Sequence, residues 1–234
     1  MLTLHTFPPA LGTRSPSPFT LKVEALLTMA KLPYQKAFGI PASAPRQKFP
    51  VLQNGQQHIP DSAHIQRFLE QTYDIDFDKG LDVRTKSTAL AYQHMIEDHL
   101  YFINVYFRWV EHGPDIKAAF FGEVPTPLRA LLFWKIHRKV LKMLHMQGLG
   151  RHTRDELIEF VRQDLEALSQ QLGDQPYLMG DQVTSVDASL YGALHNIIES
   201  DLETPLKQQA LHHHNLVDYC QRFRREIFED GTQS

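Results

Sequence analysis

Only one of the 234 residues is a cysteine, Cys220, so the chain cannot form an internal disulfide. A lack of disulfides suits a reducing compartment, and we expect a cytoplasmic protein. The sequence also lacks an uninterrupted apolar run of the roughly 20 residues that a membrane-spanning helix needs. Its first ten residues do not show the basic and then apolar pattern of a secretion signal. We therefore expect no membrane partner.

An excess of positive charge is missing as well. The chain has 24 Lys and Arg residues against 27 Asp and Glu residues, a formal net charge of -3. Because binding to nucleic acid depends on a basic field that neutralises phosphates, we expect no nucleic-acid partner. Hydrophobic residues make up 42% and charged residues 22% of the chain, which is typical of a folded globular protein. Small molecules or proteins are the expected partners.

The first 74 residues mix strand and helix signals. Strands are predicted at 2–7, where Pro8 and Pro9 end the run, and at 33–38, 51–53 and 57–59. Asn54-Gly55 marks a hairpin turn between the last two strands. Helices are predicted to begin at Ser17-Pro18 and at Asp61-Ser62, the second ending near Tyr73. This order predicts a compact α/β domain over residues 1–74.

The pattern then changes to helices alone. An acidic, glycine-containing linker is predicted at 75–81, followed by an all-helical domain over 82–234. Apolar residues recur at helical spacing in five segments: 82–111, 126–147, 153–172, 185–199 and 214–228. The sequence therefore predicts two domains of different class.

Ser17 is the first candidate for chemistry. A serine followed by proline at a helix start is most simply an N-cap residue. A helix N-terminus also favours an anion such as a thiolate, by ~0.3 to 2 kcal/mol, and a hydrogen bond from the Ser17 hydroxyl would add ~1.5 to 3 kcal/mol. Together these contributions could lower the pKa of a thiol by about two units. That shift converts a minor thiolate fraction at neutral pH into the major, nucleophilic form.

Two further elements are predicted to lie on the same groove. Pro50 stands directly before a strand, and in a thioredoxin-like arrangement a cis proline there lets the backbone of Val51 pair with a bound peptide. Asp61 and Ser62 are ordinary cap residues by default. They could also hold the ammonium and carboxylate groups of a ligand at a helix N-terminus.

These residues resemble the glutathione transferase superfamily. Ser17-Pro18 with Lys22-Val23 is similar to its catalytic loop and first helix, Pro50-Val51-Leu52 to its cis-proline segment, and Asp61-Ser62 to its γ-glutamyl motif. The segments 176–181 and 184–188 are similar to the entry of its buried helix, where Thr184 and Asp187 would form a structural capping box. The segment 148–153 looks most like the branch of metaxins and failed-axon-connections proteins.

The resemblance implies the glutathione transferase fold, a thioredoxin-like N-terminal domain with an all-α C-terminal domain. It also implies glutathione as cosubstrate, transferred to a hydrophobic electrophile, and a homodimer. Ser17 would face the sulfur and Val51, after Pro50, would pair with the cysteinyl unit. Asp61 and Ser62 would hold the γ-glutamyl end, and Lys48 the glycyl carboxylate. The segment before Pro50 is short and rich in proline, so we expect the family's second helix to be reduced.

Several interpretations stay open. Members of the metaxin branch include noncatalytic proteins, so the alternative is a binding module for protein interaction or ligand carriage. Tyr101, Phe102 and Tyr106 could line a site for the hydrophobic electrophile or could be core residues. His94, Glu97, Asp98 and His99 are close in sequence but are typical of a solvated helix, and we expect no metal.

Overall fold

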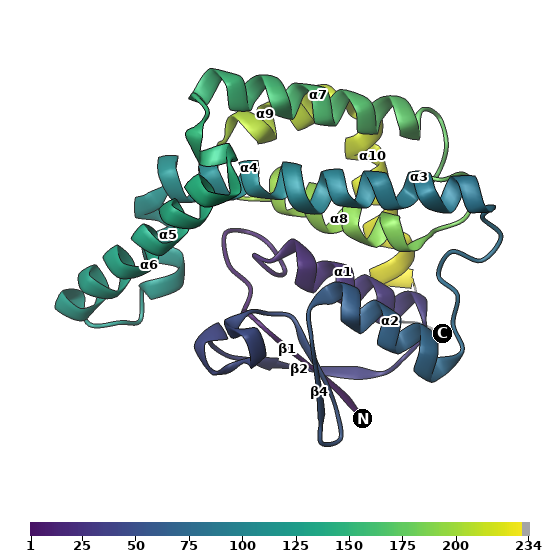
Figure 1. The fold of residues 1–234 in the computed structure, drawn as a ribbon, viewed down its shortest axis with the longest axis horizontal. Helices are drawn as coiled ribbons and strands as arrows, with labels where there is room; N and C mark the ends of the chain where they lie inside the picture. The colour runs from purple at the N-terminus through teal and green to yellow at the C-terminus, as the bar shows by residue number, and fades with distance from the viewer. Residues whose placement is uncertain (231–234) are drawn as a thin grey trace.

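Figure 1 shows the computed structural model, which describes residues 1–230, as a small α/β layer covered by a larger group of helices. The fold class predicted from the sequence, a thioredoxin-like domain followed by a helical domain, is confirmed. None of the helices in the described part of the chain is both long and apolar enough to cross a bilayer.

The α/β layer contains one mixed sheet in the order β2-β1-β3-β4. Its strands are β1 (Leu2–Thr6), β2 (Tyr34–Phe38), β3 (Val51–Asn54) and β4 (Gln57–Pro60). β1 pairs in parallel with β2 and antiparallel with β3, which pairs antiparallel with β4. The predicted strands agree with these bounds to within one residue. The predicted hairpin is also confirmed, and its Gly55 has the positive φ of +59° that such turns favour.

Helices α1 (Pro18–Met29) and α2 (Ser62–Tyr73) complete this layer. α1 lies between the sheet and the helical domain, where it packs against α8 (Ser185–Ile198). At Gly192 in α8, a Cβ atom would lie 2.4 Å from the carbonyl oxygen of Pro18. The first turn of α1 therefore approaches α8 as closely as it does because residue 192 has no side chain.

The segment between β2 and β3 is irregular. It contains two short 3₁₀ turns, Pro41–Ser43 and Pro45–Gln47, in which Arg46 and Gln47 have positive φ angles. The predicted reduction of a helix in this segment is thus confirmed.

The helical domain differs from the prediction at three points. The expected helix over 82–111 is helical throughout but comprises α3 (Val83–His94), α4 (Tyr101–Tyr106) and two π-helical turns, Met95–Leu100 and Phe107–Glu111. Two helices were not predicted, α5 (Gly113–Phe121) and α9 (Pro205–His212). Proline occupies an early position in both, which breaks a preceding helix but suits the first turn of a new one. The expected helix over 214–228 is likewise helical throughout but comprises α10 (His214–Phe223) and a π-helical segment, Arg224–Asp230.

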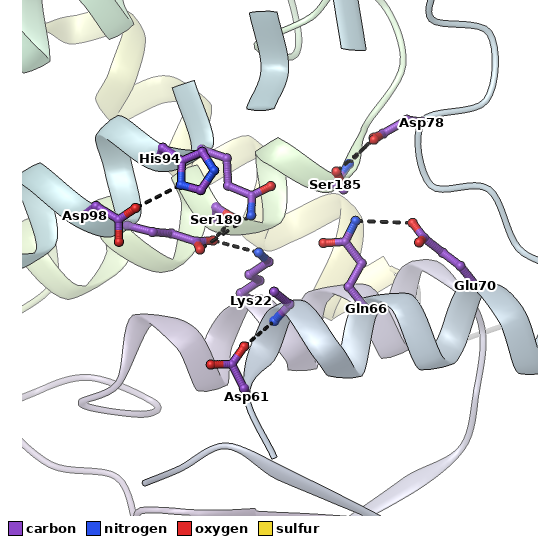
Figure 2. Close-up of polar contacts among 12 residues, drawn as sticks. Lys22, Asp61, Gln66, Glu70, Asp78, His94, Asp98, Ser185 and Ser189 are labelled. Atoms are coloured by element: carbon purple, nitrogen blue, oxygen red, sulfur yellow. Dashed lines mark hydrogen bonds and ion pairs between the residues drawn. The ribbon is translucent and has the colours of Figure 1, made fainter. Parts of the chain in front are cut away.

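The remaining helices, α6 (Thr126–Gln147), α7 (Arg154–Leu172) and α8, are predicted closely. α8 is the central helix of this domain, and every residue from Ser185 to Ile197 is buried. The predicted capping box at its start is present, since the Asp187 carboxylate accepts hydrogen bonds from the Thr184 backbone N–H at 2.9 Å and from the Thr184 hydroxyl at 2.7 Å. The Asp78 carboxylate, in the segment between the two domains, contacts Ser185 at the same end of α8 (Figure 2).

Candidate functional site

Ser17 lies where α1 begins. Its side-chain oxygen accepts a hydrogen bond from the Thr20 N–H at 3.3 Å, and Pro18 occupies the first helical position. In the described part of the chain this is the one hydrogen bond that Ser17 Oγ makes, so its hydroxyl proton has no acceptor there. The cap and a hydrogen bond to a ligand are therefore compatible, because the oxygen serves the helix while the proton stays free.

The second predicted binding element adjoins the third. The Phe49–Pro50 peptide bond is cis, as the sequence analysis expected. The Pro50 carbonyl accepts a hydrogen bond from the Asp61 N–H at 3.2 Å. Val51 begins β3 and is 1% exposed. This backbone contact brings the start of β3 and the start of α2 together.

At the start of α2, Asp61 is exposed and Ser62 is buried. Asp61 Oδ1 accepts from the Ala63 N–H at 3.0 Å, the N-cap contact visible in Figure 2. Its φ angle is +82°, a conformation that is unusual for a residue other than glycine. Strained positive-φ residues concentrate at ligand sites, so this feature agrees with a binding role. Lys48 is exposed in extended backbone just before Phe49.

The loop before Ser17 is held by two buried side chains that the sequence analysis did not single out. Arg108, from the π-helical turn after α4, donates to the Pro16 carbonyl at 2.9 Å. Asn196 of α8 donates to the Ser15 carbonyl at 3.1 Å. For Arg108, the sequence signal was its position among the aromatic residues of 106–109. A charged residue in an apolar stretch either reaches solvent or is buried with hydrogen-bond partners.

A buried ion pair also joins the two domains near this loop. Lys22 of α1 is 1% exposed, and its Nζ lies 2.7 Å from Glu97 Oε1. The Ser189 hydroxyl donates to the same oxygen at 2.6 Å, so Lys22 and Ser189 converge on one carboxylate (Figure 2). The sequence analysis interpreted Glu97 as part of a solvated helix surface; its side chain is instead only 15% exposed and pairs with Lys22.

The three aromatic residues proposed for a hydrophobic site lie in different surroundings. Tyr101 packs edge-on against Phe19 at the start of α1, with a centroid distance of 4.7 Å, and lines a cavity of about 10 Å³ beside Lys22. Phe102 and Tyr106 are partly buried against the main core. A larger open cavity, about 590 Å³, lies between Leu11 of the β1–α1 loop, α5 and residues 201–203. A role for the three aromatic residues in binding an electrophile stays a prediction.

The other candidate reactive groups are the acidic and histidine side chains and Cys220. Among the side chains that the structure describes, there is no group of three or more His, Cys, Asp or Glu residues that could hold a metal ion. Cys220 is 2% exposed, and burial raises the pKa of its thiol to about 12, so it is an unreactive core residue.

His195 of α8 lies beside the same loop. It is 3% exposed, and its Nε2 accepts from the Arg14 N–H at 3.4 Å. Burial, with smaller contributions from the cations Arg14 and Arg224, lowers the pKa of His195 to about 4. The imidazole is therefore neutral at pH 7.

We expect His195 to make the fold sensitive to acid. In the unfolded chain its pKa returns to about 6.5, so between pH 6.5 and 4 the unfolded state binds the proton first. Its contribution is fully present above pH 6.5 and declines toward pH 4 by roughly 3 kcal/mol. Urea unfolding at pH 7.5, 6 and 5 measures this slope. His195→Gln should flatten it, whereas His94→Gln, at an exposed histidine, should not; equal slopes in all three proteins would contradict the prediction.

The geometry described so far is that of a thioredoxin-like domain with a capped helix N-terminus, a cis proline and a helical partner domain. Comparison with known proteins agrees with this class. The family model described as "Glutathione S-transferase N-terminal domain" matches residues 18–114, and "Glutathione S-transferase, C-terminal domain" matches residues 161–223.

Two relatives and one solved structure illustrate the range of similar proteins. The isoprene-epoxide–glutathione S-transferase of Rhodococcus sp. (strain AD45) is 29% identical over 97% of this chain and 99% of its own. Metaxin-2 of Mus musculus is 30% identical over 90% of this chain and 82% of its own. The crystal structure of glutathione transferase GSTFuA3 from Phanerochaete chrysosporium has a TM-score of 0.67 at 18% identity, covering 97% of each chain. The chain belongs to the glutathione S-transferase family, and the predicted similarity to metaxins is confirmed.

Proposed function

We propose that the chain is a glutathione transferase that binds glutathione, stabilises its thiolate at Ser17 and conjugates it to a hydrophobic electrophile. The observation that carries the proposal is the free hydroxyl proton of Ser17 at the N-terminus of α1. A thiolate there would receive a hydrogen bond from Ser17 and would lie in the favourable field of the helix N-terminus. The similarity to an isoprene-epoxide–glutathione S-transferase supports an epoxide or a comparable small electrophile as the second substrate.

The start of α2 suits the other end of glutathione. Asp61 uses Oδ1 to cap α2, which leaves Oδ2 for the α-ammonium of the γ-glutamyl unit. Ser62 at the helix N-terminus would receive the α-carboxylate. Backbone pairing with Val51, next to the cis Pro50, and an ion pair between Lys48 and the glycyl carboxylate complete the proposed contacts.

Replacing Ser17 by alanine is expected to lower turnover of glutathione with a reactive electrophile by about 10- to 100-fold. A hydrogen bond to a charged group contributes roughly 1.5 to 3 kcal/mol, and each 1.4 kcal/mol changes a rate tenfold. Steady-state kinetics with an epoxide and a chloronitrobenzene electrophile measure the change. Ser17→Thr keeps the hydroxyl and should retain most of the activity; full activity in Ser17→Ala would contradict the proposed role.

Binding is tested separately by calorimetry with glutathione. Asp61→Asn keeps the cap of α2 but removes the negative charge, so it should weaken glutathione binding by up to about fivefold. Asp82→Asn is a matched control, since Asp82 caps α3 through its contact with the Thr85 N–H. If the unchanged protein releases no heat with glutathione, the proposal fails.

The second candidate function is a noncatalytic binding module that acts in protein interaction or ligand carriage. The similarity to metaxin-2 over 90% of this chain favours it. It predicts no turnover with any electrophile, and either no glutathione binding or binding without reaction. A homodimer and a cytoplasmic location are part of the proposal under either function, and light scattering and cell fractionation test them.

A further inference from the structure

Arg108 is a buried cation at the junction of the two domains. Its guanidinium donates through Nη1 to the Pro16 carbonyl at 2.9 Å. Through Nη2 it donates to the Asn196 carbonyl at 2.7 Å and to Asn196 Oδ1 at 3.0 Å. The residue is 7% exposed. All three of its partners are neutral oxygen atoms.

No carboxylate of the described side chains balances the charge of Arg108. Among residues 1–229, no Asp or Glu lies within ion-pair distance of its guanidinium. Burial lowers the pKa of Arg108 to about 10, which still leaves it charged at neutral pH. Leaving a buried charge without a counter-ion is costly, so charged residues in the interior are normally paired. An anion bound nearby would supply the missing partner.

Other charged groups near this loop do not supply that counter-charge. Lys22 is paired with Glu97, and Arg14 lies 3.6 Å from Glu24, which also pairs with Lys36. His195 is neutral at pH 7, and burial raises the pKa of Tyr101, the ionisable group that interacts with Arg108. The residues around the loop therefore leave the positive charge of Arg108 unbalanced next to the N-terminus of α1.

That charge contacts the residue next to the proposed thiol site. Arg108 holds the carbonyl of Pro16, the residue directly before Ser17, and Asn196 holds the carbonyl of Ser15. The partial positive charge of the α1 N-terminus has the same sign as Arg108, and both favour an anion at Ser17.

We infer that Arg108 is a positioning residue for the thiolate site: it fixes the Ser15–Ser17 loop and supplies, from the helical domain, the buried positive charge that stabilises an anion at Ser17. The inference rests on the proposed function for its biological meaning, but the electrostatic claim concerns any thiolate at this position. Arg108 acts through the loop and its field, without touching the substrate.

A cysteine at position 17 measures this effect without glutathione. Ser17→Cys introduces one reactive thiol, because Cys220 is buried and unreactive. The rate of alkylation by iodoacetamide as a function of pH gives the pKa of Cys at position 17, which we expect to lie well below the usual value near 8.5. Adding Arg108→Met should raise that pKa by about one unit or more, a tenfold change in acid dissociation. Arg154→Met, at an exposed arginine paired with Glu111, should leave it unchanged.

A second variant covers the case in which Arg108→Met does not fold. Asn196→Asp keeps the oxygen that accepts from Arg108, places a carboxylate beside the guanidinium and also removes the amide that donates to the Ser15 carbonyl, so both parts of the inference are weakened together. Neutralising the charge in this way should also raise the pKa of the thiol at position 17. An unchanged pKa in the folded variants would overturn the inference. The thiol pKa is measured without glutathione, so its outcome is independent of the calorimetric test of the proposed function. Either test can fail while the other succeeds.

Discussion

Glu97→Ala is expected to lower the free energy of unfolding by about 3 to 5 kcal/mol, the usual cost of leaving one member of a buried ion pair alone. Lys22 Nζ lies 2.7 Å from Glu97 Oε1, and the Lys22 side chain is 1% exposed. Without the carboxylate, its ammonium would remain in the interior between α1 and the helical domain. The Ser189 hydroxyl would lose its acceptor as well. Urea unfolding measures the loss.

The neighbouring residue provides the control. Asp98 forms a pair with His94 at 2.9 Å, but both side chains are more than 60% exposed. Asp98→Ala should therefore change the stability by less than about 1 kcal/mol. The double variant Lys22→Met/Glu97→Gln removes both charges and should recover much of the loss, since an uncharged pair carries no desolvation penalty for an ion. A Glu97→Ala protein as stable as Asp98→Ala would show that Lys22 finds water or another partner.

Signals that act over a few residues made most of the fold predictable. The turn at Asn54-Gly55, the serine and proline that begin α1 and the capping box at the start of α8 each depend on contacts within four residues of chain. Such contacts can be predicted from residue spacing alone, because local backbone geometry determines which side chains and backbone groups can meet. The three elements of the candidate groove were identified in this way.

Contacts between the two domains could not be predicted in the same way. Lys22 and Glu97 are 75 residues apart, and Arg108 is 92 residues from Pro16. Helical periodicity indicates which face of a helix is apolar, but not which partner lies opposite a charge on that face. Lys22 and Glu24 stand within the otherwise apolar helix 18–29, and this was the signal that both are buried. The prolines at the starts of α5 and α9 were ambiguous, since proline both ends and begins helices.

Asp187→Ala should be the most damaging single substitution in the helical domain. The Asp187 side chain is fully buried and accepts hydrogen bonds from the backbone N–H groups of Leu178 and Thr184, both at 2.9 Å. The hydroxyl groups of Thr184 and Tyr219 also donate to it, at 2.7 and 3.1 Å. The Tyr219 hydroxyl also contacts the backbone carbonyl of Asp187, so three donors would be left without an acceptor. At about 1 to 3 kcal/mol for each buried donor, the sum is roughly 3 to 9 kcal/mol. Against a typical total of 5 to 15 kcal/mol, that loss should leave little folded protein at 37 °C.

The same motif occurs at the surface and separates the effect of capping from the effect of burial. Thr153 and Glu156 form a capping box at the start of α7, where both residues are exposed. Glu156→Ala should cost far less than Asp187→Ala, because water replaces the lost acceptor. Urea midpoints of the two variants make the comparison, and soluble yield replaces them if Asp187→Ala does not fold. Equal midpoints would mean that the cap alone, rather than four buried donors converging on one carboxylate, determines the contribution of Asp187.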